Sequence, residues 1–108
     1  MINFFRKEKS PIIKDLGSVA KLNRERAKTR KMEAYVPMFN LMLNDIQVNL
    51  TQGKNSFDYP YTEERLLCVN LYRSSFREWG RRHNLDITIS VFSTSNPPII
   101  NFFMSEIR

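Results

Sequence analysis

The chain has 108 residues and a formal net charge of +6, and 42% of its residues are hydrophobic, which is enough for one modest core. Its single cysteine and single histidine exclude an intramolecular disulfide and leave too few ligands for a structural zinc site. The apolar patch within residues 1–5 is far shorter than the core of a signal peptide, and the charge-free segment 87–105 contains too many polar residues for a membrane span, which needs about twenty mainly apolar ones. We therefore expect a cytoplasmic protein.

The positive charge is concentrated at the N-terminal end. Residues 1–31 contain ten basic and three acidic side chains, whereas residues 32–108 contain seven basic and eight acidic ones. A highly charged segment with few large apolar side chains has little to bury against a core. We predict a basic, partly helical N-terminal arm over 1–31 and a single small α+β domain over 32–108.

Two parts of the arm are informative. Ser10-Pro11 is a typical helix start, because serine caps the first turn and proline needs no hydrogen bond there. The segment 23–31 has no apolar side chain larger than Ala27, which predicts a solvated helix or a disordered connector. Clustered basic side chains attract phosphates, and the residues that we predict to bind nucleic acid here are Lys21, Arg24, Arg26, Lys28, Arg30 and Lys31. The alternatives are a solubilising helix face and an acidic protein partner.

The next segment has the hydrophobic period of a helix. Apolar residues recur at three- and four-residue spacing over 32–51, and Pro37 is expected to start or kink this helix. A short alternation of apolar and polar residues leaves a strand at 45–51 as the competing prediction, although we favour the helix. Gly53 is expected to end either element, and we predict a loop over 52–61.

A second core helix is predicted over 62–83. Thr62 is a typical N-cap, and the end is expected at Gly80 or at His83-Asn84. One broad face is apolar, and a row of arginines about one turn apart lines the other; the row consists of Arg73, Arg77 and Arg81. This spacing can follow a phosphate backbone, which makes the row a second predicted nucleic-acid-binding surface. The alternative is that these arginines pair with surface carboxylates such as Glu78.

The C-terminal segment alternates apolar and polar residues and predicts a β-hairpin that begins near Leu85 and turns at 95–98. A hairpin alone is only marginally stable. It must therefore pack on the 62–83 helix, gain a third strand from 45–51, or pair with another subunit. The last possibility predicts a homodimer through the hairpin edge.

Aromatic residues in the 52–61 segment form a further candidate site. Phe57, Tyr59 and Tyr61 can stack on bases or bind a protein partner, and the alternative is that they cover the core. Trp79 and Cys68 lie on the apolar helix face and are expected in the core. The single histidine, His83, lies at a helix end, where a structural role is expected. No catalytic residue, cofactor, metal or small-molecule substrate is predicted.

These patterns predict a small non-enzymatic accessory protein that binds nucleic acid mainly through the phosphate backbone. The alternative is a protein-interaction or assembly subunit, such as an inhibitor or a viral or phage structural component, with the basic arm on an acidic partner and the hairpin edge used for self-association. A membrane surface is the least favoured partner. The charges alone do not distinguish DNA, RNA and an acidic protein.

Overall fold

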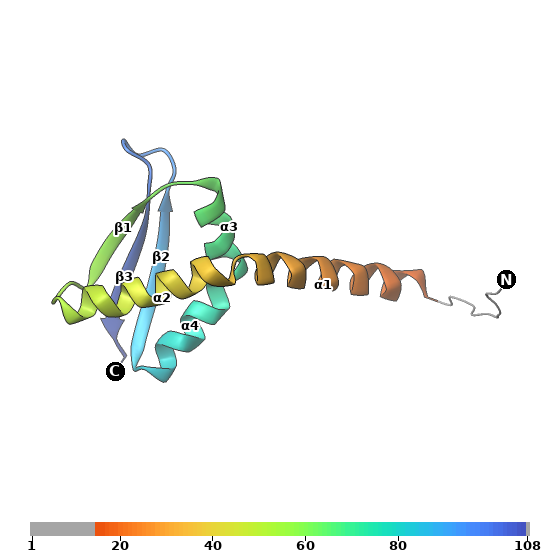
Figure 1. Ribbon diagram of the computed structural model, residues 1–108, viewed down its shortest axis with the longest axis horizontal. Coiled ribbons are helices and arrows are strands. Elements are labelled where there is room, and N and C mark those ends of the chain that lie inside the picture. The colour runs from red at the N-terminus through yellow and green to blue at the C-terminus, as the bar shows by residue number, and fades with distance from the viewer. Residues whose placement is uncertain (1–14, 108) are drawn as a thin grey trace. The chain divides into compact units, whose positions relative to one another are not determined.

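The structure, a computed structural model, describes residues 15–107, so the predicted helix start at Ser10-Pro11 lies outside the described residues. The chain divides into two compact units, Met1–Lys31 and Met32–Arg108, and each is described by itself. The fold is α+β, with four helices and three strands among the described residues (Figure 1).

The first unit contains most of helix α1 (Leu16–Ala34). Asp15 caps its start, because its carboxylate accepts hydrogen bonds from the backbone N–H of Ser18 at 3.2 Å and from the Ser18 hydroxyl at 2.6 Å. These bonds to Ser18 lower the pKa of Asp15. No residue of α1 is buried within the described part of the chain. Of the two predictions for 23–31, the structure shows the solvated helix.

Helix α2 (Val36–Thr51) follows a turn at Tyr35, whose N–H donates to the carbonyl of Met32 at 3.0 Å. Pro37 lies in the first turn of α2, where its missing N–H costs nothing, so it starts the helix as predicted. Residues 45–51 belong to this helix, and the competing strand prediction is wrong. Gly53, with φ of 83°, lies just beyond the helix in the left-handed region that glycine adopts easily.

The third strand of the sheet comes from a different segment than predicted. Strand β1 (Ser56–Pro60) lies in the segment expected to be a loop, so the loop prediction over 52–61 is wrong there. Its side chains alternate between exposed and half-buried, because Phe57 and Tyr59 face the core while their neighbours face solvent. Asn101 fastens the strand by donating to the Ser56 hydroxyl at 2.9 Å and to the Asp58 carboxylate at 2.8 Å.

The helix predicted over 62–83 is two helices, α3 (Glu63–Leu71) and α4 (Arg73–Arg82), so the prediction of one continuous helix is wrong. Thr62 caps α3 as expected, accepting a hydrogen bond from the N–H of Arg65 at 3.1 Å. The break is at Tyr72, which is buried, stacks on the ring of Phe39 at 4.2 Å between centroids, and donates from its hydroxyl to the carbonyl of Met32. These contacts hold Tyr72 outside helical geometry.

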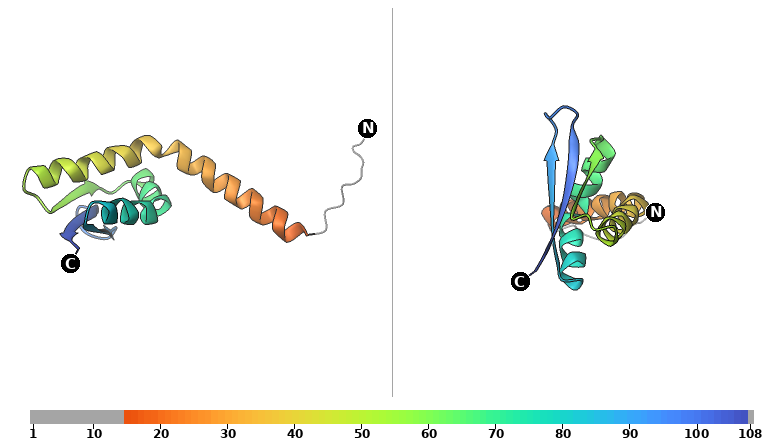
Figure 2. Two further views of the ribbon diagram at one scale, coloured as in Figure 1. Left: turned by 90° about the horizontal axis from the view of Figure 1, so that it is seen from below. Right: turned by 90° about the vertical axis from the view of Figure 1, so that its left-hand side faces the viewer.

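The predicted hairpin is confirmed as strands β2 (Leu85–Phe92) and β3 (Ile99–Glu106). The three strands form an antiparallel sheet in the order β1-β3-β2, with Phe102 of β3 between Phe57 and Ile89. Helices α2, α3 and α4 lie on one side of the sheet, and no other helix or strand of residues 15–107 covers the opposite face (Figure 2). The hairpin therefore gains both a third strand and a helical layer.

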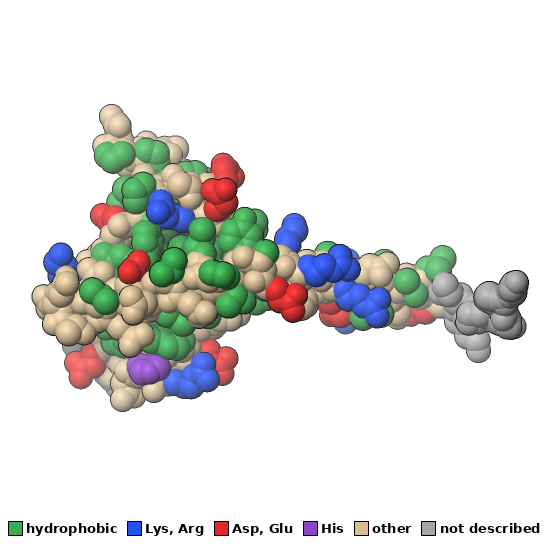
Figure 3. Space-filling view, in the orientation of Figure 1, with side chains coloured by type: hydrophobic (Ala, Val, Ile, Leu, Met, Phe, Trp, Pro, Cys, Tyr) green, Lys and Arg blue, Asp and Glu red, His purple; other side chains and the backbone are tan. Residues whose placement is uncertain are grey.

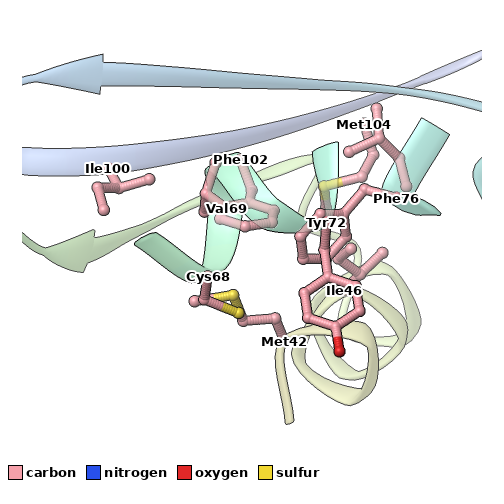
Figure 4. Close-up of a cluster of buried hydrophobic side chains, with 10 residues drawn as sticks. Met42, Ile46, Cys68, Val69, Tyr72, Phe76, Ile100, Phe102 and Met104 are labelled. Carbon is pink, nitrogen blue, oxygen red and sulfur yellow. The ribbon is translucent and has the colours of Figure 1, made fainter. Parts of the chain in front are cut away.

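The core lies between the sheet and the helices. Figure 4 shows Phe102, Phe76 and Tyr72 at its centre, with Cys68 and Met42 beside them. Phe76 meets Phe102 edge-on, with 5.5 Å between ring centroids. The buried side chains are those of Met42, Ile46, Cys68, Val69, Tyr72, Phe76, Ile87, Ile100, Phe102 and Met104.

Gly80 is a close-packing position inside α4, not the end of the helix. A Cβ atom there would lie 2.8 Å from the carbonyl oxygen of Leu85 and 3.0 Å from Cδ1 of Ile87. We expect Gly80→Ala to lower the free energy of unfolding by about 1–3 kcal/mol, because the crowding outweighs the better helix propensity of alanine. Ser74→Ala, on the exposed side of the same helix, is the matched control and should be neutral or slightly stabilising. Urea unfolding of both variants tests this, and an equally stable Gly80→Ala protein would contradict it.

Candidate nucleic-acid interface

All six basic residues of the arm that are predicted to bind nucleic acid are exposed on helix α1. At about 100° per residue, four of them fall within about 80° of one another on one side of the helix. We call this set the long basic row; it consists of Lys21, Arg24, Lys28 and Lys31. The other two, Arg26 and Arg30, lie on the opposite side and are called the short basic row. Figure 3 shows Lys and Arg side chains along the near face of α1.

The charges of α1 are unbalanced, because its six basic residues are accompanied by only two acidic ones, Glu25 and Glu33, which offset part of the repulsion. Arg26 and Arg30 are four residues apart on one face, as are Arg24 and Lys28, and such like-charge pairs each cost about 0.2–0.5 kcal/mol. Residues 16–31 of this helix are all exposed, so only Met32, which packs against the core near the C-terminal end of α1, provides tertiary packing to offset this cost. A bound polyanion would remove the repulsion. The arrangement is therefore more favourable in the presence of closely spaced negative charges than without them.

The arginine row of α4 is only partly available. Arg73 donates from Nη1 to the carbonyl of Ile89 and from Nη2 to the side-chain oxygen of Asn70, both at 3.3 Å. Its guanidinium thus has a structural role beside the outer edge of β2. Arg77 and Arg81 are exposed one turn apart. A cavity of about 200 Å³ beside Arg73 and Arg77 also has Asp86 in its wall, which weakens its attraction for anions.

The three predicted partner-binding aromatics contribute to the domain itself. Phe57 stacks on Phe102 with 5.2 Å between centroids, and Tyr59 meets the same ring edge-on at 5.5 Å. The Tyr59 hydroxyl donates to Asp45 at 2.5 Å, and burial together with this bond raises the pKa of Tyr59 far above its usual value. Tyr61 is half-buried and also packs against the core. These positions agree with the alternative interpretation, in which the rings cover the core.

The other chemically active side chains are also held by the fold. The Nδ1 atom of His83 lies 2.9 Å from the carbonyl oxygen of Trp79, at the end of α4. Cys68 is fully buried, and burial raises its pKa to about 11. Residues 15–107 contain no group of three or more histidine, cysteine or acidic side chains that could hold a metal ion. None of the described helices is both long and apolar enough to cross a membrane.

The buried thiol predicts a loss of stability at alkaline pH. The folded-state pKa of Cys68 is raised from 9.0 to about 11, so its stabilising contribution is complete below about pH 9 and is lost as the pH rises to about 11. We expect urea unfolding to show a decrease of about 2 kcal/mol between pH 8 and pH 10.5. The Cys68→Ala protein should show a smaller decrease over the same interval. Equal pH dependence in the two proteins would contradict the assignment to this thiol.

One exposed apolar residue was not among the sequence-based candidates. Leu41 of α2 is 65% exposed and lines a cavity of about 220 Å³ together with Met38, Asp45 and Arg65. Its place on the helix is the only signal that could have found it, because it lies well away from the stripe of α2 residues that face the core. An exposed leucine beside a cavity is a candidate contact for a protein partner.

Comparison of the chain with protein-family models, with curated proteins and with solved structures finds no match. The candidate interface therefore depends on charge, exposure and helix geometry. The six basic side chains of α1 satisfy all three criteria. Arg77 and Arg81 form a second and smaller basic surface on the other unit of the chain.

Proposed function

We propose that the chain is a small, non-enzymatic, cytoplasmic protein that binds nucleic acid, mainly through phosphates contacted by α1. One observation carries this proposal: α1 has six exposed basic side chains and no buried residue. Met32 packs against the core, but core packing does not account for residues 16–31 of this helix, which are all exposed. Regularly spaced phosphate groups would neutralise the positive side chains of α1 and so reduce their mutual repulsion. Arg77 and Arg81 would add contacts from α4.

The salt dependence of binding tests this function. Each phosphate contact on B-form DNA contributes about −0.9 to the slope of log K against log salt concentration, so six contacts predict a slope of about −5. We would measure the affinity of the full chain for a fluorescent 20-base-pair DNA, a duplex RNA and a single strand by anisotropy, at several salt concentrations. Absence of binding to all three at low salt, or binding that salt does not weaken, would remove the proposal.

The second candidate function, a protein-interaction or assembly subunit, is favoured by the exposure of Leu41 beside its cavity. Light scattering of the full chain should then give a mass above that of one chain, and Leu41→Ser should reduce it. The predicted homodimer through the hairpin would pair along the outer edge of β2, where Arg73 already binds the carbonyl of Ile89. That edge is thus partly protected against self-association. A strict monomer at all concentrations would argue against assembly.

A further inference from the structure

The two basic rows of α1 are separated by a face of small and polar residues. At about 100° per residue, Asn23, Ala27 and Ala20 lie within about 60° of one another, between the long and the short basic rows. The exposed Leu16 lies in the same sector, one turn before Ala20, so the small face begins at Ala20. Of the two acidic residues of α1, Glu25 lies on the opposite side of the helix, whereas Glu33, near the C-terminal end of α1, lies next to the short basic row in the same projection. Viewed along its axis, the part of α1 over residues 20–31 has one face of small and polar side chains with a basic row on each side and Glu25 at the back.

This cross-section fits a groove better than a flat surface. A helix with its side chains is about 10–12 Å wide, which matches the major groove of B-form DNA at about 12 Å. With the small face toward the base pairs, each basic row would point to a different phosphate backbone. The B-form minor groove, at about 6 Å, is too narrow, and the major groove of A-form RNA is too narrow and deep for side chains to read. A single strand offers phosphates on one side only.

We propose that α1 binds in the major groove of B-form DNA, with the long and short basic rows on opposite phosphate backbones and Asn23 toward the base edges. This inference rests on the proposed function and adds the kind of nucleic acid and the orientation of the helix. Ala20 and Ala27 allow close approach, because their side chains extend little beyond the backbone. The Asn23 amide can bond in two places with the major-groove edge of adenine, so sites that contain adenine should be preferred.

The two rows provide the first test, because groove binding needs both of them. In the full chain we would compare Arg26→Gln/Arg30→Gln with Lys28→Gln/Lys31→Gln, since glutamine keeps helix propensity while it removes the charge. At 0.1 M salt each lost phosphate contact lowers affinity about 8-fold, so each pair should lose about 60-fold on duplex DNA and reduce the salt slope by about 2. Wild-type affinity of the Arg26→Gln/Arg30→Gln protein would overturn the inference.

The second test locates the helix in the groove. Dimethyl sulfate modifies guanine N7, in the major groove, and adenine N3, in the minor groove; we expect protection of N7 only. Ala27→Leu adds bulk to the small face and should weaken DNA binding by about tenfold. Thr29→Leu adds similar bulk at the back of α1 and is the matched control, expected to bind like wild type.

The outcomes separate the two proposals. Unprotected N7, equal affinity for duplex RNA, or identical binding by the Ala27→Leu and wild-type proteins would overturn the major-groove inference. Nucleic-acid binding as such would then remain, with α1 lying along one row of phosphates. If the wild-type chain binds no nucleic acid at low salt, both proposals fail together.

Discussion

Replacing Phe102 with alanine is expected to lower the free energy of unfolding by about 3–5 kcal/mol, the usual cost of removing a fully buried phenylalanine ring. Phe102 has no exposed surface, and its ring contacts those of Phe57, Tyr59 and Phe76 with centroids 5.2–5.5 Å apart. It therefore joins β1, β3 and α4 at one point. Since small domains are stable by about 5–15 kcal/mol in total, this loss leaves the domain marginal or unfolded.

The neighbouring residue supplies the control. Phe103 follows Phe102 in β3 but points to the face of the sheet opposite the helices, where it is 45% exposed. Phe103→Ala should change the free energy of unfolding by only about 0.5–1 kcal/mol, through lost cross-strand contacts. Urea titrations followed by circular dichroism compare the two variants. Similar destabilisation by both substitutions would mean that the helices do not cover the face on which Phe102 lies.

The sequence predicted the apolar face of the 62–83 segment but not its break. Neither a proline nor a glycine lies at the break, so local propensity favours a continuous helix. Tyr72 leaves helical geometry because Phe39 stacks on its ring and the Met32 carbonyl accepts a hydrogen bond from its hydroxyl group. Both partners come from residues more than thirty positions earlier. Contacts of that kind are formed only in the folded chain, and no pattern within 62–83 encodes them.

The third strand was missed for a related reason. The alternation of Phe57 and Tyr59 with polar neighbours in β1 is present in the sequence, but it is short and ends at Pro60 among residues typical of turns. What makes this segment a strand is its pairing with β3, where Phe57 lies opposite Phe102. The alternation of apolar and polar residues predicted β3 and its pairing with β2. It did not predict that β1 pairs with the other edge of β3.

The basic residues of the candidate interface could be predicted from the sequence, but not all of their contacts could. Charges can be counted, and a segment without large apolar side chains implies exposure, so the basic residues of α1 were found directly. Their division into two rows follows once the helix is known to be continuous through Lys31. The role of Arg73 was not predictable, because the Ile89 carbonyl that it binds is exposed only by the position of β2 at the edge of the sheet.

Replacing all six predicted basic residues of α1 with glutamine should abolish nucleic-acid binding while the unfolding of the domain stays unchanged. The changed residues are Lys21, Arg24, Arg26, Lys28, Arg30 and Lys31. If each contributes one phosphate contact, the affinity for duplex DNA at 0.1 M salt should fall by about 10⁵-fold. Stability should not change, because these side chains are exposed and none belongs to the core. Anisotropy measures the first effect and urea unfolding the second.

The matched comparison is Arg77→Gln/Arg81→Gln in α4, which removes two exposed charges from the other unit of the chain. If both arginines contact phosphate, this variant loses about 60-fold in affinity; if neither does, it binds like wild type, and in both cases the loss is far smaller than that from α1. Wild-type binding by this variant would show that the position of the charges matters, because a protein attracted only by its overall charge would lose affinity in proportion to the charges removed, which for two charges is again about 60-fold. An effect of the α4 pair as large as that of the six α1 substitutions would place the main interface on α4.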